Sequence, residues 1–451
     1  MRLTSDPVDA AGLEARVFQR LDARLSVDAA HPLALALSGG GDSMALLGLA
    51  GAWARTRGRR LLALTVDHRL NSASAAWTVF AGDAARAAGA DWRALAWDGP
   101  KPETGVTAAA RRARHALIAE AARAAGARVV LFAHTADDAA EADWMRERGS
   151  TLGRVRAWSP SPAWPEGRGL ILFRPLLEER RAALRDWLAA QQVGWIEDPA
   201  NADPRFGRSR ARQALAGGGQ PAEIPPLAAE PSRLHGLGHG MVEGDRALSP
   251  RALAAALVCV GGGDRPPRLE RLEALVRRLR GGEDFVATLA GARLEAAGRR
   301  VRMMREAGEQ ARRDVRPMAL PLGRAMIWDG RVRFLAREDG LRVRPARGLL
   351  ASLSPDDRAV IATLPAGARG AAPVLIRDGL RGPVLASPAV DRAELVPERL
   401  RLALDETTHE DDLNPADDGV TPWNDLFSRT EHPDRRLDPG RRTTEDLNEP
   451  A

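Results

Sequence analysis

Near the start of the chain, a glycine-rich turn connects a short apolar run to an Ala-rich segment of helical length. The apolar run is residues 32–37, the turn reads Ser-Gly-Gly-Gly-Asp-Ser from Ser38 to Ser43, and the helical segment is residues 42–57. Glycines let backbone N–H groups approach an anion closely, and a helix N-terminus adds unsatisfied donors and the positive end of the helix dipole. These segments predict a strand, a phosphate-binding loop and a helix in succession. The structural alternative is a tight turn in which Asp42 only caps the helix.

The same alternation of strand and helix continues through the first two hundred residues. Further apolar runs are residues 61–66, 91–97, 128–133 and 170–173, and the helical segments between them are residues 73–89, 107–126 and 137–148. This pattern predicts a doubly wound parallel sheet of the Rossmann type, with helices on both faces. Ligands of such sheets bind beyond the carboxyl ends of the strands, so we expect the chemistry just after Leu37, Val66 and Ala133.

The rest of the chain predicts smaller C-terminal domains. We expect a catalytic domain over residues 1–215, a Gly- and Pro-rich linker over 216–247 and a small α+β domain over 248–316. Helices at 251–260 and 268–280, followed by a hairpin at 285–304 that turns near Ala297 and Gly298, form the small domain. Residues 317–404 read as short strands and loops without clear definition. Residues 405–451 are polar and acidic, which predicts a disordered tail.

Composition limits the class of protein. Cys259 is the only cysteine, which excludes an intramolecular disulfide and a zinc site made of cysteine pairs, and fits a reducing cytoplasm. No apolar stretch reaches the length of a membrane span, so we expect a cytoplasmic protein without a membrane partner. The net charge of +6 fits a nucleic-acid partner, although a solvated basic surface would give the same value. The oligomeric state stays open, with a homodimer among the expectations.

The glycine-rich turn distinguishes between three phosphate-binding motifs. A Walker loop requires Gly-Lys-Ser/Thr, and the turn has no lysine, while the dinucleotide fingerprint requires a glycine where Met44 stands. The turn matches SGGxDS in full, and in this it resembles the PP-loop ATP pyrophosphatases. That resemblance implies an adenine-nucleotide α-hydrolase-like fold and an enzyme that cleaves ATP between the α and β phosphates to form an adenylated intermediate. The ATP-binding residues would be Ser38, Gly39, Gly40, Gly41, Asp42 and Ser43.

Further motifs narrow the resemblance to the tRNA(Ile)-lysidine synthase family. In chain order they are Val66-Asp67-His68, the ARxxRY-like Ala110 to His115, the HxxDD motif His134 to Asp138, Arg174-Pro175-Leu176-Leu177, and the WxxDPSN-like Trp195 to Asn201. The succession of the loop, HxxDD, RPLL and WxxDP motifs is specific. The resemblance covers residues 32–212 well, is weaker at 288–306 and around 328–330, and is not visible in the tail.

The resemblance implies a ligation in two steps. ATP adenylates the C2 oxygen of the wobble cytidine in an isoleucine tRNA with the anticodon CAU. Free lysine then attacks C2 and displaces AMP, which leaves lysidine. The implied partners are therefore this tRNA and free lysine, and the implied cofactors are ATP and Mg²⁺.

Candidate roles follow for the charged residues of these motifs. Asp42, His134 and Asp137 are the expected catalytic residues. Asp42 and Asp137 are also the expected metal ligands, because two carboxylates at neighbouring strand ends can hold an ion that phosphate oxygens and water complete. Free lysine carries both charges, and Arg114, Asp138 and Glu141 are its expected partners. The arginines expected to bind tRNA are Arg111, Arg205, Arg208 and Arg212.

Simpler explanations exist for several of these residues. Asp137 and Asp138 could only cap the helix that they begin, His68 could be an ordinary histidine at a strand end, the run from Arg111 to Arg114 could be a solvated helix face, and Trp195 could belong to the core. The chain also departs from the family pattern, with His115 in place of tyrosine, Ala139 in place of glutamine and Ala142 in place of threonine.

These departures and the shared loop leave rival functions. A catalytically weak RNA-binding relative would keep the fold and lose turnover. A different PP-loop enzyme, such as a tRNA thiolase, would need cysteine or iron–sulfur chemistry, for which Cys259 alone is insufficient. An amidotransferase or NAD synthetase would use the same loop, but the Arg-rich segment after the WxxDP motif favours RNA.

Overall fold

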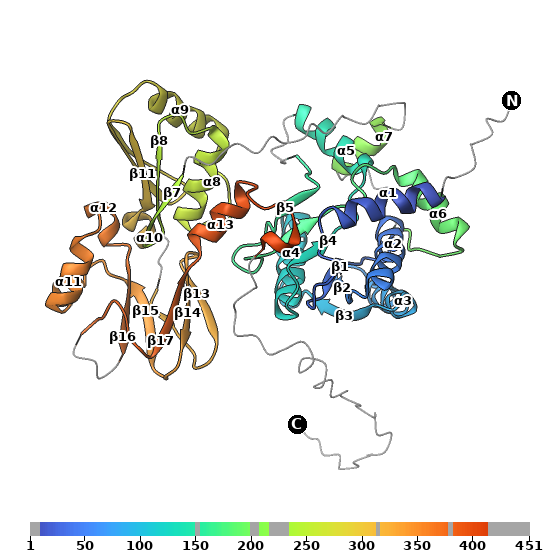
Figure 1. The fold of residues 1–451 in the computed structure, drawn as a ribbon, viewed down its shortest axis with the longest axis horizontal. Helices are drawn as coiled ribbons and strands as arrows, with labels where there is room; N and C mark the ends of the chain where they lie inside the picture. The colour runs from blue at the N-terminus through green and yellow to red at the C-terminus, as the bar shows by residue number, and fades with distance from the viewer. Residues whose placement is uncertain are drawn as a thin grey trace, which may run out of the picture.

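The computed structural model describes residues 10–148, 154–198, 207–215, 234–312, 316–377 and 382–413. These residues form two lobes that are joined side by side, with helix α13 between them (Figure 1). The N-terminal lobe contains a six-stranded sheet, and the C-terminal lobe contains one five-stranded and two three-stranded sheets. None of the helices in this part of the chain has the length and apolar character that crossing a membrane requires.

The sheet of the N-terminal lobe has the strand order β3-β2-β1-β4-β6-β5. Strands β3, β2, β1, β4 and β6 are parallel, and only β5 at the edge runs antiparallel to β6. The chain builds β1, β2 and β3 in one direction and then crosses to β4 on the other side of β1, which creates a switch point between β1 and β4. The strands are β1 (Leu33–Ala36), β2 (Leu61–Asp67), β3 (Asp91–Ala96), β4 (Val129–Leu131), β5 (Trp158–Pro160) and β6 (Ile171–Phe173).

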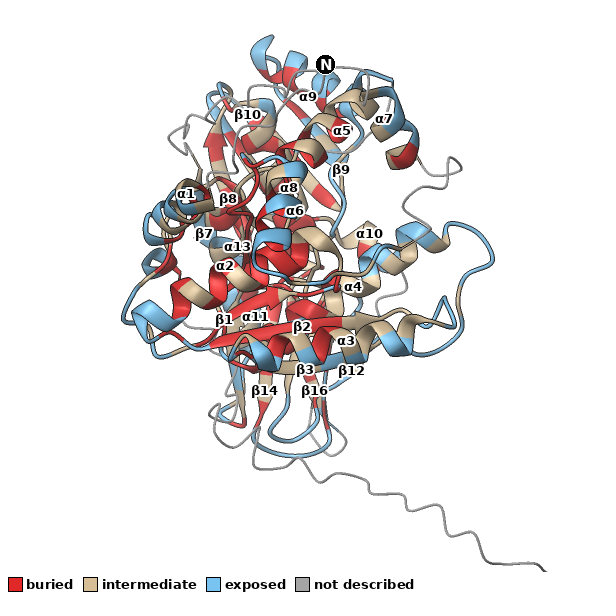
Figure 2. Ribbon diagram, turned by 90° about the vertical axis from the view of Figure 1, so that its right-hand side faces the viewer, coloured by how far each residue is buried: buried red, intermediate tan, exposed pale blue. Residues whose placement is uncertain are grey.

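Helices cover both faces of this sheet, which confirms the predicted doubly wound fold. Successive strand residues point to opposite faces, so Leu33 and Leu35 pack with α1, α2, α3 and α6, while Ala34 packs with α4. Buried residues accordingly concentrate in the strands and on the inner sides of the helices (Figure 2). The helices are α1 (Ala10–Asp22), α2 (Gly41–Arg57), α3 (Ser74–Ala87), α4 (Val106–Ala124), α5 (Ala136–Glu147), α6 (Arg181–Ala190) and α7 (Gly207–Leu215).

The first part of the C-terminal lobe contains more strands than we predicted. The expected hairpin is a three-strand meander, because a second tight turn at Ala290 and Gly291, both with positive φ, precedes the turn at Gly298. Strands β7 and β8 lie within the expected linker, where β8 pairs with β11. The elements are β7 (His235–Gly238), β8 (Met241–Asp245), α8 (Pro250–Gly261), α9 (Leu269–Arg280), β9 (Phe285–Leu289), β10 (Ala292–Ala297), β11 (Arg300–Arg305) and α10 (Ala307–Arg312).

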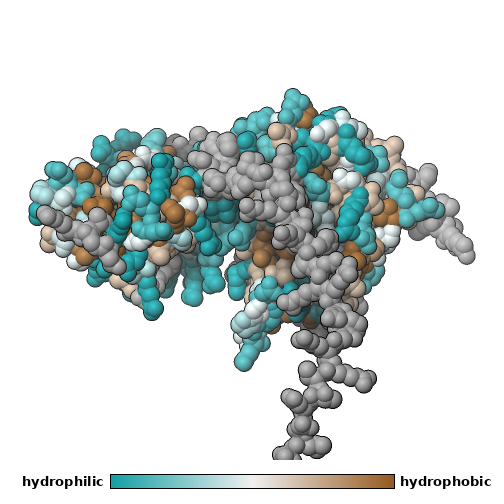
Figure 3. Space-filling model, turned by 90° about the horizontal axis from the view of Figure 1, so that it is seen from below, coloured by the Kyte–Doolittle hydropathy of each residue, from teal (hydrophilic) through white to brown (hydrophobic). Residues whose placement is uncertain are grey.

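The region that we predicted as short strands and loops forms two small antiparallel sheets that share one core. Trp328 and Phe334 from one sheet pack with Val343 and Leu375 from the other. The visible surface of both lobes is mainly hydrophilic (Figure 3). The elements are β12 (Met318–Ala319), β13 (Ala325–Trp328), β14 (Val332–Ala336), β15 (Leu341–Pro345), η2 (Leu350–Ser352), α11 (Pro355–Ala362), α12 (Ala366–Arg369), β16 (Pro373–Arg377), β17 (Val390–Glu394), α13 (Val396–Ala403) and η3 (Glu410–Asp412).

The prediction that a disordered tail begins at Asp405 is wrong for residues 405–413, which we call the return segment. Asp405 pairs with Arg156 of the N-terminal lobe and with Arg251 of the C-terminal lobe. Glu410 is fully buried against Arg59, and Leu413 joins the core of the N-terminal lobe. The remaining tail residues, 414–451, lie outside the described residues. The other domain boundaries stay a proposal.

Candidate active site

The phosphate loop follows β1 and starts α2, as predicted. Gly39 adopts φ +83°, and Gly40 precedes the first helical residue. The Ser43 hydroxyl donates to the Gly40 carbonyl over 2.8 Å and lies 3.1 Å from the Ser38 hydroxyl. No side chain caps α2, so Asp42 is not the simple helix cap of the structural alternative. The loop therefore keeps backbone N–H groups at the N-terminus of α2 without a side-chain partner.

The WxxDP segment packs on this loop. The Ile196 N–H donates to the Gly39 carbonyl over 2.9 Å, and the indole of Trp195 lies 3.5 Å from the position that a Cβ at Gly41 would occupy. Trp195 is only partly buried, and it packs against the core of the lobe as well as against the loop. The segment that we expected to be core and loop thus forms one wall of the phosphate loop.

Gly39→Ala is expected to destabilise the protein and to weaken ATP binding. A left-handed backbone costs a non-glycine residue about 1–2 kcal/mol, and a Cβ at this position would lie 2.6 Å from Ile196 Cδ1. Gly126→Ala is the matched control, because Gly126 has φ +77° and no atom within 4 Å of the added Cβ. Thermal unfolding and calorimetric ATP titration would measure both variants. Equal ATP affinities for the two would show that the contact with Ile196 does not shape the loop.

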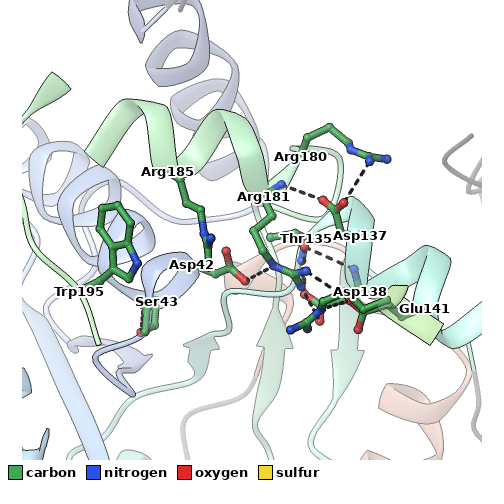
Figure 4. A network of polar contacts seen from close by, with 12 residues as sticks. Asp42, Ser43, Thr135, Asp137, Asp138, Glu141, Arg180, Arg181, Arg185 and Trp195 are labelled. Carbon is green, nitrogen blue, oxygen red and sulfur yellow. Dashed lines mark hydrogen bonds and ion pairs between the residues drawn. The ribbon is translucent and has the colours of Figure 1, made fainter. Parts of the chain in front are cut away.

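Acidic side chains of α5 face the loop across the switch point (Figure 4). Asp138 forms a capping box with Thr135, accepting from its backbone N–H over 2.9 Å, which confirms the capping role that we considered. The other Asp138 oxygen lies 3.5 Å from Arg181 and 3.4 Å from Arg208. Glu141 is 2% exposed and accepts from Arg181 over 3.2 Å and from Arg212 over 2.9 Å.

Asp137 has different partners from its neighbour. Its carboxylate accepts from the backbone N–H of Arg181 over 2.8 Å and pairs with the Arg180 side chain over 3.1 Å. Asp137 therefore holds the N-terminus of α6, while Asp138 and Glu141 share the Arg181 guanidinium with Asp42. Asp42 and Asp138 are thus connected by ion pairs to the same residue, Arg181. That Asp42 and Asp137 together bind a metal ion stays a prediction.

Arg181 is the central residue of this acidic cluster, and our sequence reasoning missed it. Its Nε donates to Asp42 Oδ2 over 3.1 Å, and the same guanidinium reaches both acidic residues of α5. The available signal was the charged run from Glu178 to Arg181, which directly follows RPLL and begins an amphipathic helix. In a chain with 66 lysine and arginine residues, that run alone does not stand out.

Two buried carboxylate oxygens beside Arg181 have no hydrogen-bond partner. They are Asp42 Oδ1 and Glu141 Oε2. Burial raises the pKa of Asp42, although the charge of Arg181 opposes this effect. No group of three or more metal-ligating side chains occurs in the described ranges. A cation at Asp42 would therefore need further oxygen ligands, which fits Mg²⁺, since this ion usually combines one or two carboxylates with phosphate oxygens and water.

Basic side chains line the site between α4 and β6. Burial, together with the charges of Arg111 and Arg208, lowers the pKa of Arg114 to about 10. The Arg114 Nε is buried without a partner, and Arg114 forms no ion pair within the described residues. Burial and the charge of Arg111 likewise lower the pKa of Arg174 to about 10. Arg114 and Arg174 thus form a buried cationic cluster in which neither guanidinium has an ion pair among the described residues.

His134 accepts a hydrogen bond from this cationic cluster. Arg174 Nε donates to His134 Nδ1 over 3.2 Å, and since a guanidinium only donates, the ring proton of neutral His134 is on Nε2. Burial, together with the charge of Arg174, holds the pKa of His134 well below its usual value. His134 is thus neutral and presents an N–H group, which suits contact with an anion better than proton abstraction.

The remaining predicted residues fall into three groups. Arg208 and Arg212 contact the acidic residues of α5, so the tRNA contact that we predicted for them stays a prediction. Arg111 is exposed on α4, whereas His115 is buried with both ring nitrogens unpartnered and stacks on Phe132. Arg205 lies outside the described residues.

Comparison with known proteins agrees with this site. Residues 13–217 match the family of PP-loop domains. The tRNA(Ile)-lysidine synthase of Caulobacter vibrioides is 46% identical over 357 residues, which are 79% of this chain and 86% of that protein. The tRNA(Ile)-lysidine synthase of Mesorhizobium japonicum is 36% identical over 389 residues, covering 78% and 83%, and that of Ruegeria pomeroyi is 34% identical over 378 residues, covering 75% and 85%. With the phosphate loop, the acidic residues of α5 and these matches together, the chain belongs to the tRNA(Ile)-lysidine synthase family of ATP-using PP-loop enzymes.

Proposed function

We propose that this protein ligates free lysine to C2 of the wobble cytidine of an isoleucine tRNA with the anticodon CAU, converting ATP to AMP and pyrophosphate. The observation that carries the proposal is the meeting of three features at the switch point. These are the phosphate loop after β1, the acidic residues after β4, and the cationic cluster of Arg114 and Arg174.

The phosphate loop supplies the donors for ATP cleavage. Backbone N–H groups from Gly39 to Ser43 and the dipole of α2 stabilise the charge that develops on the leaving pyrophosphate. Asp42 would hold Mg²⁺ through its unpartnered Oδ1, and the ion would supply further positive charge to the phosphates. His134 donates its Nε2–H to a phosphate oxygen or to the oxygen that becomes adenylated.

The acidic and basic groups beyond the loop fit the two charges of free lysine. The unpartnered Glu141 Oε2 accepts an N–H of the substrate ammonium, with Asp138 beside it. Arg114 receives the substrate carboxylate, because its buried guanidinium has no carboxylate of its own. For tRNA, the net charge of +6 and the candidates Arg111, Arg205, Arg208 and Arg212 support electrostatic binding. A cytoplasmic location and a homodimer stay predictions that cell fractionation and sedimentation would test.

The test is an assay with purified protein, ATP, Mg²⁺, labelled lysine and an isoleucine tRNA transcript with the anticodon CAU. Lysine incorporation and AMP release confined to this tRNA, with a methionine tRNA as control, are the expected results. AMP release without lysine incorporation would retain the PP-loop chemistry and indicate a different acceptor.

A catalytically weak RNA-binding relative is the second candidate, because Ala139 and Ala142 depart from the family pattern beside the site. Both residues are buried in α5, where their small side chains leave the capping box and the Glu141 ion pairs in place. The retained network favours an active enzyme. Salt-sensitive tRNA binding without any AMP release would reverse that preference.

Arg114→Gln is expected to raise the KM for lysine with a smaller effect on AMP formation in the first step. Hydrogen bonds to charged groups contribute about 1.5–3 kcal/mol, so an increase of roughly 10- to 150-fold is expected. Steady-state kinetics at varied lysine concentration would measure it. Arg112→Gln is the control, since Arg112 is exposed on the same helix. An unchanged KM for lysine in Arg114→Gln would remove Arg114 from the lysine site.

A further inference from the structure

Arg181 is the shared counter-ion of the carboxylates on both sides of the active site. Its guanidinium lies 3.1 Å from Asp42, 3.5 Å from Asp138 and 3.2 Å from Glu141. In Figure 4 its side chain extends from the start of α6 into the space between the phosphate loop and α5. No other arginine with a described ion pair to α5 also contacts Asp42.

The ion pairs around Arg181 leave no excess negative charge to attract a cation, and Arg185 and Arg111 add positive charge near Asp42 and Asp138. Asp42, Asp138 and Glu141 contribute three negative charges, and Arg181, Arg208 and Arg212 contribute three positive charges. An additional cation at Asp42 would meet the guanidinium of Arg181 at short range, where like charges repel. A cation is therefore expected to bind Asp42 more tightly once the Arg181 guanidinium has turned away.

The side chain of Arg181 can turn away from Asp42 while its backbone stays in place. Its backbone is fixed, because Asp137 accepts from its N–H and the helix behind it packs through buried Leu184, Trp187 and Leu188. Its long side chain can still rotate. The carboxylate that it would release is that of Asp42, in the first turn of α2. Arg208 and Arg212 are more exposed than Arg181 and pair only with the α5 side of the cluster.

We propose that Arg181 is a positioning residue that keeps the cation site at Asp42 closed until nucleotide arrives. When phosphates bind at the loop, the guanidinium turns from Asp42 to the phosphates, and Asp42 takes the divalent cation that accompanies them. The same movement removes one of the two arginines that pair with each of Asp138 and Glu141, which makes room for the ammonium of the amine substrate. This inference rests on the proposed function and adds an order to it: nucleotide and metal bind first, and lysine binds second.

The test is to titrate the nucleotide-free full-length protein with Mn²⁺ at pH 8 and to measure the bound Mn²⁺ by electron paramagnetic resonance. Wild type is expected to bind Mn²⁺ weakly, and Arg181→Gln at least about tenfold more tightly, because the cation then no longer meets the guanidinium charge beside Asp42. Arg181→Lys keeps the charge and should resemble wild type. Arg112→Gln should also resemble wild type, because Arg112 is exposed on α4 and has no ion pair with α5 among the described residues.

A non-hydrolysable ATP analogue provides the second measurement. The analogue should tighten Mn²⁺ binding strongly in wild type and much less in Arg181→Gln. Similar nucleotide-free affinities in wild type and Arg181→Gln, with both proteins folded by thermal melting, would overturn the inference. Tight binding in Arg181→Lys or Arg112→Gln would also overturn it. Neither measurement uses tRNA or lysine, so the failure of this inference is distinct from failure of the lysine incorporation assay.

Discussion

Asp42→Asn is expected to lower AMP and pyrophosphate formation by about 10²- to 10³-fold, the usual effect of losing one group that stabilises transition-state charge. The substitution keeps the volume of the side chain and removes its charge. Asn can therefore still contact Arg181, but it supplies a much weaker cation ligand at the loop. AMP release in the presence of tRNA, lysine and Mg²⁺ would measure the effect.

Two controls separate chemistry from folding in this experiment. Asp83→Asn changes an exposed carboxylate on α3 and should leave AMP release unchanged. Thermal melting of Asp42→Asn should stay within a few degrees of wild type, because the lost ion pair with Arg181 is partly exposed to solvent. A loss of AMP release below tenfold in a folded Asp42→Asn protein would mean that the Asp42 charge is not needed for ATP cleavage.

Local pattern was sufficient to predict the five parallel strands of the N-terminal sheet, but not the antiparallel edge strand β5. The run predicted at 32–37 is β1 (Leu33–Ala36), and the helix predicted at 107–126 is α4 (Val106–Ala124). Buried parallel strands are nearly continuous apolar runs, and the Ala-rich segments between them favour helix, so each element is encoded by its own residues. Parallel topology then brings the loop after β1 and the acidic residues after β4 to the same edge, which is why their proximity was predictable.

The partners of the acidic residues were not predictable in this way. Asp137 and Asp138 are adjacent in sequence, yet one holds the backbone of α6 and the other faces Arg208 and Arg181. The choice depends on how α6 packs against α2, which is a tertiary contact with no local signature. Because most positive charge in this chain is arginine, neither spacing nor composition distinguished Arg181 from its neighbours.

The return segment was missed for a related reason. Its composition is polar and acidic, which by itself predicts disorder. Its position depends on Glu410. The Glu410 carboxylate accepts from the two terminal nitrogens of Arg59 over 2.9 and 3.1 Å and lies 2.8 Å from His31 Nε2. These partners are more than 350 residues away in sequence. The buried pair of Glu410 and Arg59, together with the Asp405 ion pairs and the buried Leu413, thus holds a segment that has few apolar side chains of its own.

Glu410→Ala is expected to destabilise the N-terminal lobe by about 3–5 kcal/mol, the usual cost of leaving a buried charge without its partner. The Arg59 side chain is 1% exposed and would lose both bonds to the carboxylate. Urea unfolding at pH 7 would measure the loss. Glu406→Gln, at an exposed position of the same segment, is the control and should change stability little. Arg59→Ala combined with Glu410→Ala should cost less than the sum of the single variants, because neither charge is then left unpaired.

The pH dependence gives this prediction a second readout. Burial alone would raise the pKa of Glu410, but hydrogen bonds from His31 and Arg59 outweigh burial and lower it to about 2. A carboxylate with a lowered folded-state pKa stabilises the fold above its usual pKa of 4.5 and loses that contribution as the pH falls towards 2. The stability difference between wild type and Glu410→Ala should therefore be constant above about pH 5 and shrink below it. A stability difference that stays constant down to pH 3 would contradict the ion pair between Glu410 and Arg59. In Glu410→Ala, residues 405–413 should also become sensitive to limited proteolysis at pH 7.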